Sequence, residues 1–187
     1  MRRVFAVVFG IGLLSCGQGS PTTPTGETYL AFGSSFAGYE SWEKFDLAQA
    51  ESPDDGGIPL TDGGCAAGHD TSAHRFGYLN KRPPTGSKEF PVGTIIVKEM
   101  QKSTAPETWQ VFAMVKRGGV FNTSGAKNWE WFEIKRDPNL PLIVWRGVGP
   151  PVGEGYGSPA CGGCNSCHGV AASNDFVVSP VLDLKNF

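Results

Sequence analysis

Four short apolar segments in the middle of the chain constrain its fold more than any other feature. Each is rich in β-branched and aromatic residues, as half-buried strands are. They are 94–100 (TIIVKEM), 109–116 (WQVFAMVK), 128–134 (NWEWFEI) and 141–146 (PLIVWR). The connections between them are short and contain Gly, Pro, Asn or Ser, so successive strands are expected to pair antiparallel.

The flanking segments complete the predicted fold. Residues 75–79 (RFGYL) predict a further short strand, and 39–50 (YESWEKFDLAQA) has the apolar spacing of an amphipathic helix. Residues 52–72 are rich in Gly, Asp, Pro and Ser and predict a loop. The length of 187 residues suits one domain. The chain therefore predicts an α+β fold that is mainly an antiparallel β-sheet with flanking helices.

The N-terminus predicts export and a lipid anchor. A basic start followed by a short apolar run, 4–14, is typical of a secretion signal and too short for a mature membrane helix. The run ends in LLSC (13–16), which resembles the bacterial lipoprotein signal, in which cleavage leaves a lipid-bearing cysteine. We therefore predict a signal peptide at 1–15 and lipidation of Cys16. An ordinary signal peptide with an incidental cysteine is the alternative.

The predicted mature chain divides into a tether and a domain. Residues 16–27 are small, polar and proline-rich and predict a flexible tether, so 28–187 would form the folded domain. Gly17 rather than Asp follows the cysteine, which by resemblance to sorted lipoproteins favours a periplasm-facing anchor in the outer membrane. Several acyl chains on one cysteine anchor a protein stably. A formal net charge of −2 with 18% charged residues provides no basic stripe, which argues against a nucleic-acid partner.

The chemistry of the chain centres on CGGCNSCHG (161–169). Within it, Cys164, Cys167 and His168 match C-x-x-C-H, the attachment signature of c-type haem. The two cysteines form thioether bonds to the haem vinyl groups, and the adjacent histidine lies under the iron as its ligand. Export agrees with this interpretation, because haem c is attached outside the inner membrane. We predict one covalent haem c with His168 as the metal ligand.

Two other metal sites stay open on the same residues. An iron–sulfur cluster could use Cys161, Cys164 and Cys167, but the run lacks the usual continuation to a fourth cysteine. A zinc site could add His168, although adjacent Cys167 and His168 suit tetrahedral ligation poorly.

Cys65 and Cys161 are the cysteines that the haem and lipid predictions leave over. Both lie in Gly-rich loops, and an exported chain matures in an oxidising compartment where disulfides persist. We therefore predict a Cys65–Cys161 disulfide, which would hold the 52–72 loop beside the haem peptide. Two free thiols are the alternative.

The sixth iron ligand decides between electron transfer and ligand chemistry, because a second protein ligand closes the site. The candidates are His69, His74, Met100 and Met114. We expect the two histidines to be solvated in a polar loop and the two methionines to lie in the core. An open distal position is therefore expected.

Several motifs together resemble cytochrome P-460, in order and spacing, over roughly residues 70–182. They are EFPVGTIIVKE (89–99), VFAMVK (111–116), NWEWFEI (128–134) and the C-x-x-C-H motif followed by NDFVVSP (174–180). The resemblance implies a mostly antiparallel sheet with helices and one haem per chain, in a family whose members are often homodimers. The related cytochromes c′-beta share this fold and bind nitric oxide without the family's lysine cross-link.

The resemblance also implies roles for individual residues. In cytochromes P-460 a lysine is bonded covalently to the haem macrocycle, and Lys98 occupies that position after the FPVGT turn. A distal arginine followed three residues later by tyrosine corresponds to Arg75 and Tyr78. The family's distal acid, which relays protons during hydroxylamine oxidation, falls at Phe112. A phenyl ring cannot transfer protons, and it resembles the phenylalanine-capped pocket of the cytochromes c′-beta.

Three functions follow from these features. The chain could oxidise hydroxylamine and pass electrons to an external redox partner, with turnover weakened by Phe112. It could instead bind nitric oxide without turnover, as cytochromes c′-beta do, or carry electrons with a sixth protein ligand. Glu99 is predicted on the opposite face of its strand and Gln110 is not an acid, so neither replaces the missing general acid.

Overall fold

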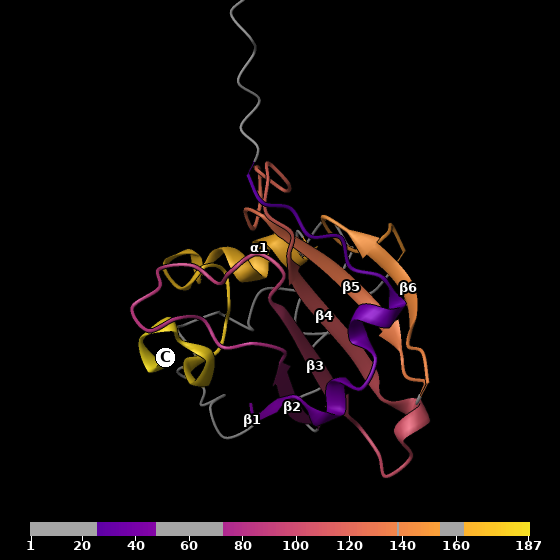
Figure 1. Cartoon of the computed structure of the whole chain (residues 1–187). Helices are drawn as coiled ribbons and strands as arrows, with labels where there is room; N and C mark the ends of the chain where they lie inside the picture. The colour runs from indigo at the N-terminus through magenta and orange to yellow at the C-terminus, as the bar shows by residue number, and fades with distance from the viewer. Residues whose placement is uncertain (1–25, 48–72, 138, 154–162) are drawn as a thin grey trace, which may run out of the picture.

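The computed structural model describes residues 26–47, 73–137, 139–153 and 163–187 (Figure 1). Six strands form a single antiparallel sheet in which each strand pairs with its neighbours in chain order. They are β1 (Glu43–Asp46), β2 (His74–Leu79), β3 (Ile95–Gln101), β4 (Gln110–Lys116), β5 (Trp129–Lys135) and β6 (Leu142–Gly147). The predicted antiparallel sheet is confirmed, and the five predicted strands agree with β2 to β6 within one residue at each end.

The helical part of the fold is small. One short α-helix, α1 (Gly163–Gly169), carries the C-x-x-C-H motif. The other helical elements in the described part of the chain are single 3-10 turns: η1 (Gly33–Phe36), η2 (Tyr39–Ser41), η4 (Pro106–Thr108), η5 (Ala172–Asn174), η6 (Pro180–Leu182) and η7 (Leu184–Asn186). No helix among the described residues is long and apolar enough to cross a bilayer. The architecture is thus α+β, with the sheet predominant.

The predicted helix at 39–50 is wrong within its described part, which forms η2 and then β1. The spacing is misleading because its apolar residues serve two different faces of the sheet. Tyr39 and Trp42 pack into the cluster on one face, whereas Phe45 and Leu47 pack into the cluster on the other. An extended segment between them, which pairs with β2, satisfies both.

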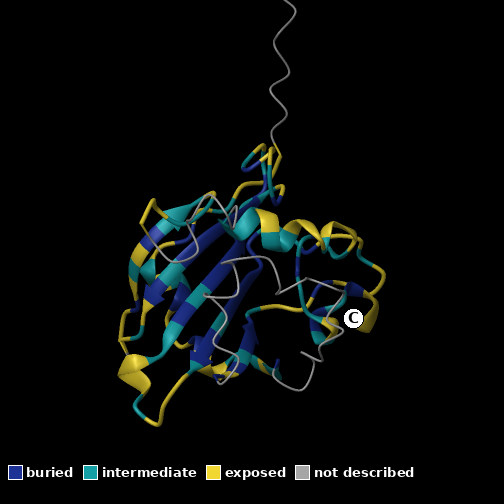
Figure 2. Ribbon diagram, turned by 180° about the vertical axis from the view of Figure 1, so that it is seen from behind, coloured by how far each residue is buried: buried dark blue, intermediate teal, exposed yellow. Residues whose placement is uncertain are grey.

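The sheet carries a hydrophobic core on each face. We call one of them the back core. It is covered by the N-terminal segment, and its buried residues include Ala31, Phe36, Tyr39, Val97 and Phe132. We call the other the front core. It is covered by the C-terminal segment, and it includes Ile96, Met114, Trp131, Val177 and Leu182. In Figure 1 the indigo N-terminal segment and the yellow C-terminal turns accordingly lie on opposite sides of the sheet. Figure 2 shows the central strands buried between them.

A buried carboxylate ties the N-terminal segment to the back of the sheet. Glu99 is 1% exposed and accepts hydrogen bonds from Tyr39 Oη at 2.6 Å and from Tyr78 Oη at 2.9 Å. Burial and these bonds to Glu99 raise the pKa of both tyrosines, so both remain neutral donors. The predicted orientation of Glu99, away from the face of Lys98, is confirmed.

Several predicted features lie outside the described residues. They are the signal peptide at 1–15, Cys16, nearly all of the 16–27 tether, the 52–72 loop with Cys65 and His69, and Cys161. Lipidation, the Cys65–Cys161 disulfide and the domain boundaries therefore stay predictions.

Candidate functional site

The C-x-x-C-H motif forms the short helix α1. Gly163, its first residue, has a φ of 67°, a left-handed conformation that glycine adopts without strain. Cys164 and Cys167 are three residues apart, so both thiols lie on one side of the helix. Burial, together with the nearby Cys167, raises the pKa of the Cys164 thiol to about 12. Cys164 also packs against the front core, so α1 presents its thiols toward the sheet.

His168 is oriented by two contacts from other parts of the chain. Its Nδ1 lies 2.7 Å from the carbonyl oxygen of Phe176. Because a carbonyl can only accept, Nδ1 carries the proton, and Nε2 is the nitrogen that would bind a metal. The ring also contacts Trp131, with the ring centroids 4.4 Å apart. The chain thus holds the histidine in the tautomer and orientation that an axial ligand needs.

Asn165, the first variable residue of the motif, fixes α1 to the rest of the domain. Its Oδ1 accepts hydrogen bonds from Asn122 Nδ2 at 2.8 Å, Trp131 Nε1 at 2.9 Å and the Ala126 N–H at 3.1 Å. Its Nδ2 donates to Asn122 Oδ1 at 3.0 Å and to the Val148 carbonyl at 2.9 Å. One amide side chain therefore links α1 to the turn before β5, to β5 itself and to the segment after β6.

A row of side chains crosses the front face of the sheet beside α1. Residues directly opposite one another on paired strands share a face. The strand registers place on this row Gly77 of β2, Lys98 of β3, Phe112 of β4, Glu133 of β5 and Trp145 of β6. Trp145 belongs to the front core and Phe112 packs against it, which identifies the face. Lys98 and Phe112 are thus direct neighbours on this face.

Lys98 lies on the sheet face against which the motif helix packs. Its side chain is half-buried, and burial lowers its pKa to about 8, with the Arg75 cation as the next cause and Cys167 as an opposing influence. The strand register places Arg75 diagonally across from Lys98, and the charges of Arg75 and Cys167 both act on the Lys98 amine. Lys98 is therefore not on a solvated face of the sheet. The three residues come from β2, β3 and α1, which are distant in sequence.

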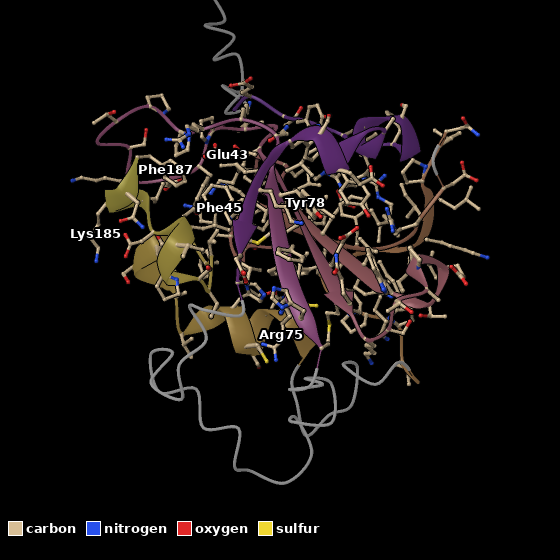
Figure 3. All side chains as sticks on the ribbon, turned by 90° about the horizontal axis from the view of Figure 1, so that it is seen from below. Glu43, Phe45, Arg75, Tyr78, Lys185 and Phe187 are labelled. Carbon is tan, nitrogen blue, oxygen red and sulfur yellow. The ribbon has the colours of Figure 1, made fainter. Side chains whose placement is uncertain are left out.

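Arg75 and Tyr78 lie on opposite faces of β2. Arg75 is 8% exposed and pairs in register with Met100, two residues beyond Lys98, so it shares the Lys98 face. Figure 3 shows Arg75 beside α1 and Tyr78 farther along the strand. Tyr78 belongs to the back core and donates to Glu99. The structure thus brings Arg75 to the candidate site and excludes Tyr78 from it.

Glu133 is the functional candidate that sequence reasoning missed. It lies directly opposite Phe112, is half-buried, and accepts a hydrogen bond from Trp145 Nε1 at 2.7 Å. The pairing of β5 with β6 is irregular between Glu133 and Ile134, and such bulges re-aim side chains near functional sites. The signal was present in the alternation Trp129, Trp131, Glu133, which puts the carboxylate on the face of the two tryptophans.

The candidate sixth ligands that the structure describes occupy other roles. Met100 and Met114 are 1% and 6% exposed, which confirms their predicted place in the core. His74 begins β2 instead of lying in a loop, and its imidazole is exposed, 3.1 Å from an oxygen of Asp46 and stacked on Phe76.

The donor set fits a c-type haem. Two thiols lie on one side of a helix, and the next residue is a histidine with Nδ1 committed to a carbonyl. The Lys98 amine, whose pKa is lowered, lies on the sheet face against which this helix packs. Apolar side chains line the same region, among them Phe112, Met114, Trp131 and Phe176. No family model, curated protein or solved structure matches the chain.

Proposed function

We propose that this protein is an exported c-type haem protein of the cytochrome P-460 type, which binds or oxidises small nitrogen compounds at an open distal site. The observation that carries the proposal is that His168 of α1 keeps Nδ1 on the Phe176 carbonyl, while Lys98 of β3 lies next to Phe112 on the sheet face against which Cys164 of α1 packs. Thioether cysteines, an axial histidine and a linking lysine together are what the cytochrome P-460 resemblance requires.

Each residue has a distinct task in this proposal. Cys164 and Cys167 would hold the haem by thioether bonds, and His168 would bind its iron through Nε2. When bound, the haem would coordinate the nitrogen of hydroxylamine or nitric oxide and take up electrons, which an external redox partner removes. Lys98 would supply the amine for the covalent bond to the macrocycle that the resemblance implies. The buried Arg75 adds a positive charge that favours negatively polarised ligands.

Glu133 favours catalysis over binding alone. Oxidation of hydroxylamine releases protons as well as electrons, so the site needs a base. Phe112 cannot accept a proton, but the carboxylate opposite it can, and the Trp145 hydrogen bond orients that carboxylate. The weak turnover expected from Phe112 is therefore no longer the favoured outcome.

Nitric oxide binding without turnover is the second candidate function. Phe112 packs against the front core, and an apolar group there excludes water from a bound ligand. Electron transfer with a methionine ligand is disfavoured, because Met100 and Met114 are both buried in the core. For the N-terminus we propose, from the sequence, a lipid on Cys16 that anchors the protein in the outer membrane, facing the periplasm.

Mass spectrometry of haem peptides from the purified protein tests the proposal. We expect one haem to join the Cys164/Cys167 peptide to the Lys98 peptide. A Lys98→Met variant should keep the haem on the cysteine peptide alone, which is the matched control. Haem-free cysteines in the wild type would refute the proposal as a whole, and haem on cysteines without Lys98 would refute the cross-link.

A further inference from the structure

We infer that the buried ion pair between Lys116 and Asp175 positions the axial histidine, because it holds the carbonyl that accepts the Nδ1 hydrogen of His168. The pair would thereby set the strength of the iron–histidine bond. This inference rests on the proposed function, since it concerns a histidine that binds haem iron. Lys116 and Asp175 are positioning residues, because neither touches the predicted haem ligand directly.

The ion pair is close and almost fully enclosed. Lys116 Nζ lies 2.5 Å from Oδ1 and 2.7 Å from Oδ2 of Asp175, and the two residues are 2% and 5% exposed. The Phe90 N–H donates to Asp175 Oδ2 at 2.8 Å. A second carboxylate, on the largely exposed Glu89, lies 3.5 Å from Lys116 Nζ. Asp175 is thus fastened to the end of β4 and to the segment before β3.

The backbone next to the ion pair is held in an unfavourable conformation. Asp175 and Phe176 have φ values of 51° and 66°, so two consecutive residues with a Cβ occupy the left-handed region. Such a conformation persists only where surrounding contacts determine it. The contacts here are the three hydrogen bonds to the Asp175 carboxylate and one from the Phe176 N–H to the Ala171 carbonyl at 2.8 Å.

This strained pair presents the carbonyl that orients the histidine. Phe176 follows Asp175 directly, and its oxygen lies 2.7 Å from His168 Nδ1. A hydrogen bond from the second ring nitrogen to a carbonyl makes an imidazole a stronger metal ligand. Fixing that carbonyl therefore strengthens the iron–histidine bond and lowers the reduction potential of the iron. Loosening it should have the opposite effect on both quantities.

The test compares substitutions of two buried carboxylates, of which only Asp175 adjoins the carbonyl that contacts His168. Asp175→Asn removes the charge but keeps a side chain that tolerates the left-handed conformation. Glu130→Gln is the matched control, because Glu130 is 2% exposed and is held by Arg146 at 2.7 and 2.8 Å. Glu130 precedes Trp131 on β5 and therefore faces the back of the sheet, away from His168. Both variants are purified with haem, and each removes the charge of one buried carboxylate that pairs with a cationic side chain.

The readouts are the iron–histidine stretching frequency of the ferrous protein, by resonance Raman spectroscopy, and the midpoint potential. We expect Asp175→Asn to lower the frequency and raise the potential, whereas Glu130→Gln leaves both at the wild-type values while lowering the thermal midpoint. Lys116→Gln should repeat the Asp175→Asn shift from the other partner, and Lys116→Arg should lie nearer the wild type.

Equal frequencies and potentials in Asp175→Asn, Lys116→Gln and Glu130→Gln would overturn the inference and leave the proposed function intact. Wild-type protein without haem on Cys164 and Cys167 would overturn both, and peptide mass spectrometry of the same sample detects that case.

Discussion

Phe112 and Glu133 are the residues on which the choice between catalysis and ligand binding depends. They lie opposite each other on β4 and β5, one unable to carry a proton and the other able to. Neighbouring strands are about 4.8 Å apart, so Glu133 lies about 10 Å across the sheet from Lys98. At the residue scale, the site therefore contains an acid at Glu133, whereas the resemblance placed the family's acid at position 112.

Glu133→Gln should lower the turnover of hydroxylamine by about 10²- to 10⁴-fold, the range typical of a lost general base. Steady-state kinetics with an artificial electron acceptor measures it, with the haem content determined on the same samples. Phe112→Glu places an acid opposite the lost one and should raise turnover, both in the Glu133→Gln background and alone.

Glu130→Gln, on the opposite face of β5, is the control for Glu133 and should leave turnover unchanged. Turnover in Glu133→Gln equal to that of the wild type would contradict the assigned role, and unchanged turnover in Phe112→Glu would count against position 112.

Lys98 should react as an amine at an unusually low pH. Burial lowers its pKa from 10.5 to about 8, so in the haem-free protein it is mostly protonated at about pH 6.5 and mostly neutral at about pH 9. Only the neutral amine can form a new bond. The labelling rate at Lys98 with a small acylating reagent, measured by peptide mass spectrometry, should rise with a midpoint near 8.

A short peptide with one lysine, labelled in parallel, provides the reference, and its labelling rate should have a midpoint near pH 10.4. The same midpoint at Lys98 would contradict the prediction. Since unfolded Lys98 binds its proton more tightly, the stability of the haem-free protein should also rise as the pH increases from about 8 toward 10.5.

At the scale of elements, α1 depends on one amide for its attachment to the sheet. Three donors from the turn before β5 and from β5 itself converge on Asn165 Oδ1. These three donors belong to Asn122, Ala126 and Trp131, and all three residues are buried. A seven-residue helix is too short to be stable by itself, so these bonds decide where the haem-binding residues lie.

Asn165→Ala should destabilise the domain by about 2–4 kcal/mol, because it leaves buried donors without their acceptor. Urea unfolding of the haem-free protein measures the free energy of unfolding. Ser166→Ala, at the exposed second variable position of the same motif, should change it by less than about 0.5 kcal/mol. Equal effects of the two substitutions would show that Asn165 is no anchor.

The strand assignments could be made from sequence because β-branched and aromatic runs between turn residues are local signals. The element that sequence misjudged was 39–50, where apolar residues at helical spacing face two separate cores. Local periodicity cannot distinguish one buried stripe from two buried faces when the segment is short. Only the pairing of β1 with β2 resolves the ambiguity.

On the scale of the whole molecule, the sheet separates two tasks. The back face is closed by the N-terminal segment and contains the buried, hydrogen-bonded carboxyl groups of Glu99 and Glu130. The front face carries Lys98, Phe112 and Glu133 and meets α1 and the C-terminal segment. Ligand chemistry is therefore expected on one side only.

Carbon monoxide should bind the reduced protein at once and with one molecule per haem. The described methionines are in the core and His74 is paired with Asp46, so we expect none of them to compete for the iron. Absorption titration measures binding, and Met100→Leu should leave the titration unchanged. Slow or incomplete binding that becomes fast in Met100→Leu would instead identify Met100 as a sixth ligand.

The sequence by itself determined what is encoded in consecutive residues. The C-x-x-C-H motif at 164–168 predicts its cofactor, and the alternation within each strand predicts its inward residues. The tertiary structure decided which distant residues meet: Lys98 with Phe112, Glu133 with Phe112, and Asp175 with Lys116. The physical reason is that strand register and buried ion pairs join positions far apart in the chain, and no local pattern records them.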